Sequence, residues 1–246
     1  MRHKKIYGWI PDRPDHRDYL YRSILLKVKL PSEVNLRKGC SAVENQGRLG
    51  SCTANALAGH LQFLENMNHE AYWDVSRLFI YYNERALEGT VDYDAGAMLR
   101  DGIKALAKDG VCKETSWPYD IEKFTCKPPV KCYQEALKRR ISSYHRLQTL
   151  DEMLNCLAEG FPFVFGFTVY ESFETLKVAR TGIVPMPKKS ERVLGGHAVM
   201  AAGYSQKTKR LIVRNSWGQE WGQGGYFTMP YAYLEALAND FWTIRQ

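Results

Sequence analysis

This sequence has no long apolar run. The longest one, from Phe161 to Val169, is interrupted by Pro162 and Gly166, and it is far shorter than the roughly 18 to 20 apolar residues that span a bilayer. The first ten residues carry basic side chains but no apolar stretch of the kind found in secretory signals. We therefore expect no membrane partner, and the sequence leaves open whether the protein is cytoplasmic or exported without a leader.

Closely spaced cysteine pairs are also missing. The six cysteines are scattered, and no two of them form a Cys-x-x-Cys pair. Structural zinc sites commonly use such pairs, so we predict no metal site and no cofactor. Since no secretory leader is visible, reduced thiols are the favoured state. No Gly-x-Ser-x-Gly turn or Lys-bearing phosphate loop occurs, which argues against serine hydrolases and nucleotide-dependent enzymes.

The charge is positive but not concentrated. The 246 residues include 34 Lys and Arg and 27 Asp and Glu, for a formal net charge of +7. Basic and acidic residues alternate along the chain, whereas a nucleic-acid-binding protein would gather its basic residues. We expect a solvated surface and no nucleic-acid partner, while the oligomeric state stays undetermined.

The first half of the sequence has helical periodicity. Apolar residues recur on one face from 52 to 66, with Ser51 as the predicted N-cap. A second helix is expected from a Ser76 cap to Gly89, and a third over 96–108. Thr149 and Glu152 form the pattern of a capping box for a short fourth helix.

The second half is typical of strands. Short aromatic and β-branched runs cover 161–170, 197–204, 210–215 and 225–229, separated by Gly, Pro and Lys-rich turns. The sequence therefore predicts an α+β protein with a helical lobe at about 30–125 and a β-rich lobe at about 126–246. A substrate site is expected in the cleft between them.

One cysteine stands where a nucleophile is often found. Cys52 opens the first predicted helix, and a helix N-terminus lowers the pKa of a thiol. Gln46 lies six residues before Cys52, and His197 lies 145 residues after it. Asn215 lies 18 residues after His197. Each residue alone has a structural interpretation: a buried thiol, a core histidine and a turn asparagine. The combination, in this order, favours catalysis.

The motifs around these residues resemble the papain family of cysteine peptidases. They are Gln46 to Cys52, Gly195-Gly196-His197-Ala198, and Asn215-Ser216-Trp217-Gly218. The resemblance implies a two-lobe fold with a barrel-like second lobe and hydrolysis of peptides or proteins through a thioester on Cys52. It further implies that His197 acts as general base and acid, Asn215 orients it, Trp217 shields that hydrogen bond, and Gln46 contributes to the oxyanion hole.

The resemblance extends over about 30–226 and implies substrate contacts as well. Gly96 would bond the backbone of an extended substrate, and Gly166 and Ala198 would line the main specificity pocket. Their small size predicts room for a bulky apolar side chain. Thr53 and Leu49 depart from the residues of secreted members, and the floor of the pocket is not assigned.

Two other activities stay open at this stage. Another thiol acyl transferase, such as a transglutaminase, ligase or deamidase, would use the same residues, and a binding protein could retain the scaffold. Residues 1–29, outside the predicted catalytic domain of 30–246, form an arm with three interpretations. They are a structural strap between the lobes, which we favour, an inhibitory prosegment, or a flexible leader.

Overall fold

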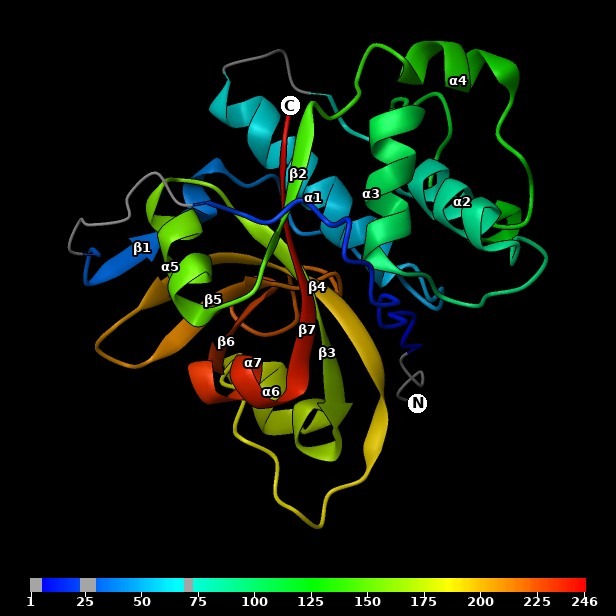
Figure 1. The fold of residues 1–246 in the computed structure, drawn as a ribbon. Coiled ribbons are helices and arrows are strands. Elements are labelled where there is room, and N and C mark those ends of the chain that lie inside the picture. The colour runs from blue at the N-terminus through cyan, green and yellow to red at the C-terminus, as the bar shows by residue number, and fades with distance from the viewer. Residues whose placement is uncertain (1–5, 23–29, 69–72) are drawn as a thin grey trace.

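The computed structural model describes residues 6–22, 30–68 and 73–246. The two ends of the predicted arm, 1–5 and 23–29, therefore lie outside the described residues. The chain folds as an α+β protein, with the helices of residues 52–136 on one side and an antiparallel sheet, with shorter helices packed beside it, on the other (Figure 1). No helix within the described ranges is long and apolar enough to cross a membrane.

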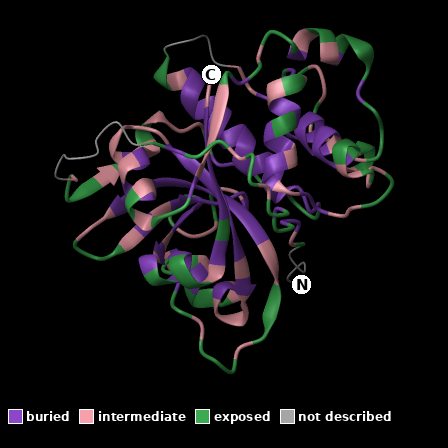
Figure 2. Ribbon diagram, in the orientation of Figure 1, coloured by how far each residue is buried: buried purple, intermediate pink, exposed green. Residues whose placement is uncertain are grey.

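Helix α1 lies at the centre of the molecule. It is rich in Ala and Leu and is buried on nearly all sides, because the sheet packs on one side and α2 and α3 on the other (Figure 2). The helices are α1 (Cys52–Met67), α2 (Arg77–Glu88), α3 (Leu99–Lys108), α4 (Val130–Ala136), α5 (Leu150–Ala158), α6 (Leu176–Thr181) and α7 (Tyr231–Leu237).

Of the three predicted N-cap residues, Ser76 and Thr149 make their cap bonds and Ser51 does not. Ser76 accepts a hydrogen bond from the Phe79 N–H, and Gly89 closes α2 in the left-handed conformation. The capping box of Thr149 and Glu152 is present at α5. The prediction for Ser51 was wrong in its detail, because its hydroxyl makes no cap bond and contacts the Tyr119 hydroxyl instead. Helix α3 begins three residues later than predicted.

The described strands form one antiparallel sheet in the order β2-β7-β3-β4-β5-β6, with β1 also paired to β4. They are β1 (Glu33–Asn35), β2 (Ser143–Leu147), β3 (Phe163–Tyr170), β4 (Val193–Ser205), β5 (Arg210–Arg214), β6 (Tyr226–Pro230) and β7 (Ala238–Arg245). Strands β2 and β6 lie at the two ends of this order and do not pair with each other. The sheet is therefore open, and the predicted barrel-like closure is not present.

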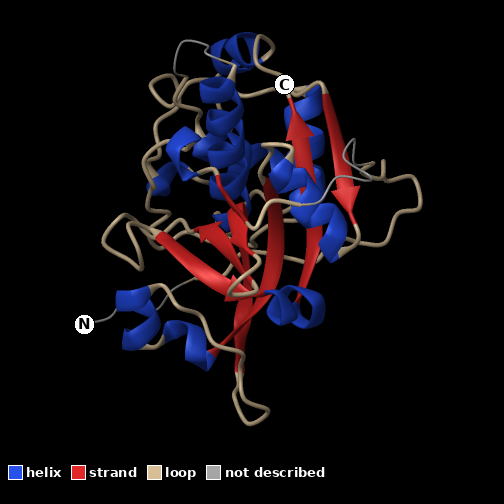
Figure 3. Ribbon diagram, turned by 90° about the vertical axis from the view of Figure 1, so that its left-hand side faces the viewer, coloured by secondary structure: helices blue, strands red, loops and turns tan. Residues whose placement is uncertain are grey.

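The interface between α1 and the sheet positions the predicted site. Figure 1 places α2, α3 and α4 together on one side of the molecule, where α3 also contacts β3 and β7. Figure 3 shows the strands and helices from the side. The N-terminal end of α1 faces β4, which pairs with β3 from Phe163↔Ala201 to Phe167↔His197 and beyond. The first residue of α1 and the middle of β4 therefore meet where the two halves of the fold join.

Candidate active site

Cys52 is the first residue of α1, as the sequence predicts, and its side chain is fully buried. Burial raises the pKa of its thiol to about 11, while backbone groups of Ala198, Gly8 and Thr53 near the sulfur act in the opposite direction. The N–H groups at the start of a helix favour a thiolate electrostatically. In this conformation the loss of solvent outweighs that effect.

His197 lies on β4, where its imidazole Nε2 is 2.8 Å from the side-chain oxygen of Asn215. Asn215 directly follows β5, and the same oxygen accepts a hydrogen bond of 2.9 Å from the Ser216 N–H. An amide oxygen accepts and does not donate, so Nε2 carries a hydrogen in this pair. Proton exchange with Cys52 then requires the other ring nitrogen, Nδ1.

Aromatic rings enclose the imidazole. Trp217 stacks on His197 with ring centroids 5.0 Å apart, and Phe167 and Phe173 approach at 5.7 and 6.4 Å. Trp217 is itself only 5% exposed. Excluding water strengthens the hydrogen bond to Asn215, because competition from solvent and its high dielectric are removed. The position of Trp217 fits the shielding role that the resemblance implies.

Gln46 lies in the turn before α1 and is fixed from both sides. Its side-chain N–H donates to the Leu49 carbonyl at 2.9 Å, and its side-chain oxygen accepts from the Ser216 hydroxyl at 2.6 Å. Its backbone N–H also donates to the Ser216 carbonyl at 2.8 Å. The segment before Cys52 is thereby joined to the segment that carries Asn215.

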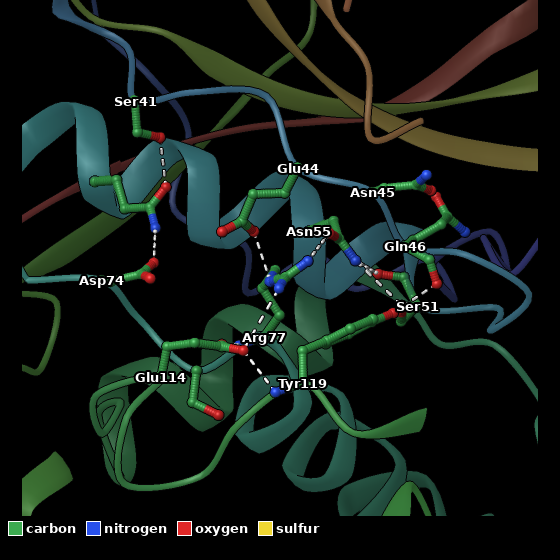
Figure 4. Close-up of polar contacts among 12 residues, drawn as sticks. Ser41, Glu44, Asn45, Gln46, Ser51, Asn55, Asp74, Arg77, Glu114 and Tyr119 are labelled. Atoms are coloured by element: carbon green, nitrogen blue, oxygen red, sulfur yellow. Dashed lines mark hydrogen bonds and ion pairs between the residues drawn. The ribbon is translucent and has the colours of Figure 1, made fainter. Parts of the chain in front are cut away.

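A partly buried ion-pair cluster supports the same turn (Figure 4). Arg77 of α2 lies 2.5 Å from Glu44 and 3.4 Å from Glu114, and its guanidinium stacks on the Tyr119 ring at 4.0 Å. The Tyr119 hydroxyl donates to the Gln46 carbonyl at 2.9 Å. Through this hydrogen bond the cluster helps to fix the position of the turn from which α1 begins.

The chain is similar to known proteins in sequence and in structure. The model of the papain family cysteine proteases matches residues 30–236. The chain is 44% identical over 98% of its length, and 86% of the other, to an uncharacterized peptidase C1-like protein of Acanthamoeba polyphaga mimivirus. The chain belongs to the papain family of cysteine proteases.

Two further relatives agree with this assignment. The structure of xylellain, a cysteine protease from Xylella fastidiosa, matches with a TM-score of 0.91 and 42% identity, over 100% of this chain and 98% of that one. Mouse procathepsin L is 28% identical over 82% of this chain and 60% of its own length. The protein is thus a papain-family cysteine peptidase, and none of these relatives supports a different acyl-transfer activity.

The N-terminal arm of this papain-family peptidase enters the site. The Ala97 N–H donates to the Gly8 carbonyl at 2.7 Å, the Ile10 N–H donates to the Ala97 carbonyl at 3.0 Å, and the Trp9 N–H donates to the Gly196 carbonyl at 3.0 Å. We call residues 7–10 the cleft segment. It is bonded on one side to the loop before α3 and on the other to β4, so it fills the groove between the lobes.

The predicted substrate-binding residues surround this segment. A side chain at Gly166 would place its Cβ 1.9 Å from the Trp9 ring, and one at Gly96 would lie 2.1 Å from the Gly8 carbonyl oxygen. Ala198 is paired with Gly166 across β3 and β4 and belongs to the same buried cluster as Trp9. Gly96, Gly166 and Ala198 therefore lie around the cleft segment, but the backbone pairing is made by Ala97.

Sequence reasoning missed several residues of the site. The sequence motifs assign no role of their own to Ser216, Tyr119 or Ala97. Tyr7 was not singled out, yet its ring lies 6.0 Å from that of His197 and 6.2 Å from that of Trp217. The sequence does contain one signal for this contact, the adjacent pair Gly8-Trp9. A glycine permits close approach of the backbone, and a tryptophan beside it can fill a pocket.

Proposed function

We propose that Cys52 is the nucleophile, His197 the general base and acid, and Asn215 the residue that orients the imidazole. The observation that carries the proposal is the bond between His197 and Asn215, 2.8 Å long and enclosed by aromatic rings, beside a cysteine at the start of a helix. A nucleophile, a base and an orienting group are the minimum set for covalent acyl transfer.

The chemistry proceeds in two halves. His197 takes the proton of the Cys52 thiol, and the sulfur attacks the carbonyl carbon of the scissile peptide bond. The C–N bond then breaks to leave a thioester, and the His197 imidazolium gives its proton to the leaving amine. A water molecule then attacks the thioester with His197 as base, which releases the acid product and restores the thiol. Asn215 holds the ring in one orientation throughout, so each proton transfer uses Nδ1.

Gln46 is proposed to stabilise the oxyanion with its side-chain N–H, together with the backbone N–H of Cys52. The bond from Ser216 fixes the amide so that the nitrogen, rather than the oxygen, faces the Leu49 side. A preorganised donor of this kind needs no reorientation during the reaction. Substitution Gln46→Ala is expected to lower kcat/KM by about 100- to 1000-fold.

The proposed substrate is an extended peptide that replaces the cleft segment. Ala97 offers both its N–H and its carbonyl to a passing strand, as the bonds to Gly8 and Ile10 illustrate. The pocket beside Gly166 and Ala198 holds the indole of Trp9, which is 8% exposed. A bulky apolar or aromatic residue of the substrate is expected to use the same space.

The cleft segment is proposed to keep the peptidase latent. Cys52 and His197 are each 0% exposed while residues 7–10 are in place, so a substrate carbonyl has no access to the sulfur. Gly8 passes so close to Gly50 that a Cβ on Gly8 would lie 1.7 Å from the Gly50 carbonyl oxygen. Substitution Gly8→Ala should therefore displace the segment without altering any proposed catalytic residue.

The test is covalent labelling by an epoxide thiol-protease inhibitor, located by mass spectrometry, with cleavage of a denatured protein as the second measurement. In the Gly8→Ala background we expect one label on Cys52 together with proteolysis. Both should disappear on adding Cys52→Ala. The matched control is Cys126→Ala, which removes an exposed thiol and should change neither. Labelling elsewhere, or a label on Cys52 without cleavage, would contradict the proposal.

A further inference from the structure

The arm has a second part, residues 11–21, which we call the bridging segment. None of the described contacts of this segment involves Cys52, His197 or Asn215. It runs instead over α3, β2 and β7, with prolines at positions 11 and 14 that restrict its backbone. In Figure 1 it is the dark blue trace that continues past α3 toward β2.

Asp12 connects the two lobes through a single buried carboxylate. One oxygen accepts from the Arg100 N–H at 3.1 Å, in the first turn of α3, and the other accepts from the Trp242 indole N–H at 2.8 Å, on β7. The Asp12 N–H donates to Asp240, also on β7, at 2.7 Å. A buried carboxylate with this many donors is difficult to displace, because each donor would lose its partner.

Asp18 makes the same connection with ion pairs. It lies 2.6 Å from Arg100 of α3 and 2.9 Å from Arg146 of β2, and Arg146 also pairs with Asp240 at 3.0 Å. The side chains of Asp18 and Arg100 are only 9% and 6% exposed. Removing one partner from such a cluster leaves a buried charge uncompensated.

The end of the bridging segment is incorporated into the sheet edge. The Arg146 N–H donates to the Tyr19 carbonyl at 2.7 Å, and the Tyr21 N–H donates to the Arg146 carbonyl at 2.9 Å. Tyr21 is buried in the core of the β-rich side, and its hydroxyl donates to Glu159 at 2.6 Å. These contacts cover the otherwise open edge at β2, which is a stabilising arrangement for a sheet.

The two segments therefore differ in what a substrate must displace. A peptide in the groove competes with the backbone bonds of residues 7–10 at Ala97 and Gly196. It has no reason to break the contacts of Asp12, Asp18 or Tyr21, which lie on α3, β2 and β7. The groove can be opened while the bridging segment remains bound.

We propose that the arm works in two separable parts: residues 7–10 are a removable block of the groove, and residues 11–21 are a permanent brace that holds the lobes together in the active peptidase. The proposal takes the groove of the proposed peptidase as its site. It unites two interpretations of the arm that the sequence leaves as alternatives.

The first experiment compares substitutions in the full chain by hydrogen exchange and inhibitor labelling. In Gly8→Ala, we expect residues 7–10 to lose protection and the rate of Cys52 labelling to rise about tenfold or more, while residues 11–21 keep their protection. Loss of protection along the whole of 7–21 would show that the arm moves as one body and would overturn the proposal. Retained protection in 11–21 without faster labelling would support the brace and count against the proposed peptidase site.

The second experiment tests the brace by thermal unfolding. Asp18→Asn should lower Tm by about 5 to 10 °C, because the buried Arg100 and the partly buried Arg146 lose their anionic partner. The matched control is Asp15→Asn in the same segment, whose ion pair with Arg17 at 2.8 Å involves a side chain that is 77% exposed, and it should leave Tm unchanged. Equal Tm values for the two variants would overturn the role of the bridging segment.

Discussion

The two walls of the groove differ in the forces that hold them. On the helical side, the turn that carries Gln46 rests on Arg77 and its two carboxylate partners, with hydrogen bonds from Tyr119. On the sheet side, aromatic rings surround His197, and its imidazole Nε2 is hydrogen-bonded to the side-chain oxygen of Asn215. The proposed nucleophile is thus positioned by charge and the proposed base by packing.

This difference has a chemical reason. A nucleophile and its oxyanion donors must be placed by groups with fixed directions, which hydrogen bonds and ion pairs supply. The histidine changes its protonation state during the reaction, so charged neighbours would bias it, whereas aromatic rings restrict it at low electrostatic cost. The two walls should therefore respond differently to pH and to loss of a side chain.

The largest effect is expected on the aromatic wall. Phe227 of β6 is fully buried, with ring centroids 5.4 Å from Phe173 and 5.8 Å from Trp221. Phe227→Ala should lower the free energy of unfolding by about 3 to 5 kcal/mol through the cavity it leaves. Denaturant unfolding should give nearly the same loss at pH 5 and pH 8. A strong pH dependence would contradict the distinction between the walls.

The charged wall should show the opposite behaviour. Arg77→Met leaves the partly buried Glu44 and Glu114 without their cation, at a cost of about 2 kcal/mol at pH 8. Burial already raises the pKa of Glu44 to about 7, although Arg77 lowers it, and burial also raises the pKa of Glu114. Without Arg77 both pKa values rise further, so the carboxyls protonate in the folded state as the pH falls, and the loss should shrink toward pH 5.

The control for this prediction is a second arginine. Arg48 forms a 2.5 Å ion pair with Glu122, but the two side chains are 73% and 76% exposed. Solvent screens such a pair, so Arg48→Met should leave the unfolding curve unchanged at both pH values. If Arg77→Met cost the same at pH 5 and pH 8, charge would not be what holds this wall.

Local sequence signals predicted the elements that carry the reacting groups. The start of α1 at Cys52, the Ser76 cap and the capping box at Thr149 depend on neighbours within one helical turn, and all three are confirmed. Family motifs supplied the fold class and the peptidase activity, which the comparisons confirm. The roles of the individual site residues remain predictions.

Contacts between distant segments could not be predicted in the same way. Strands β2 and β7 were not predicted. They pair although about 100 residues separate Ser143 from Arg245 in the sequence. Strand β2 is polar, and β7 follows a helix without a turn signal between them. The Ser51 hydroxyl was assigned to a cap, but Tyr119 lies within reach only in the folded protein. The division of the arm likewise depends on which surfaces residues 8, 12 and 18 meet.

At pH 4 the smallest effect is expected at Glu84, a buried acid of α2 for which the described contacts show no ion pair. Its carboxylate oxygen accepts from the Thr53 hydroxyl at 2.6 Å, next to Cys52, and burial raises its pKa well above the usual range. A carboxyl that is neutral when folded resembles an amide, so Glu84→Gln should change the free energy of unfolding by less than about 1 kcal/mol at pH 4.

The folded wild type holds a proton on Glu84 that the unfolded chain releases above its ordinary pKa of 4.5, so wild-type stability falls as pH rises. The variant lacks this slope and should gain relative stability from pH 4 to pH 8 in denaturant unfolding. A relative loss over that range would mean that Glu84 is ionised in the folded protein and that its charge helps hold the wall.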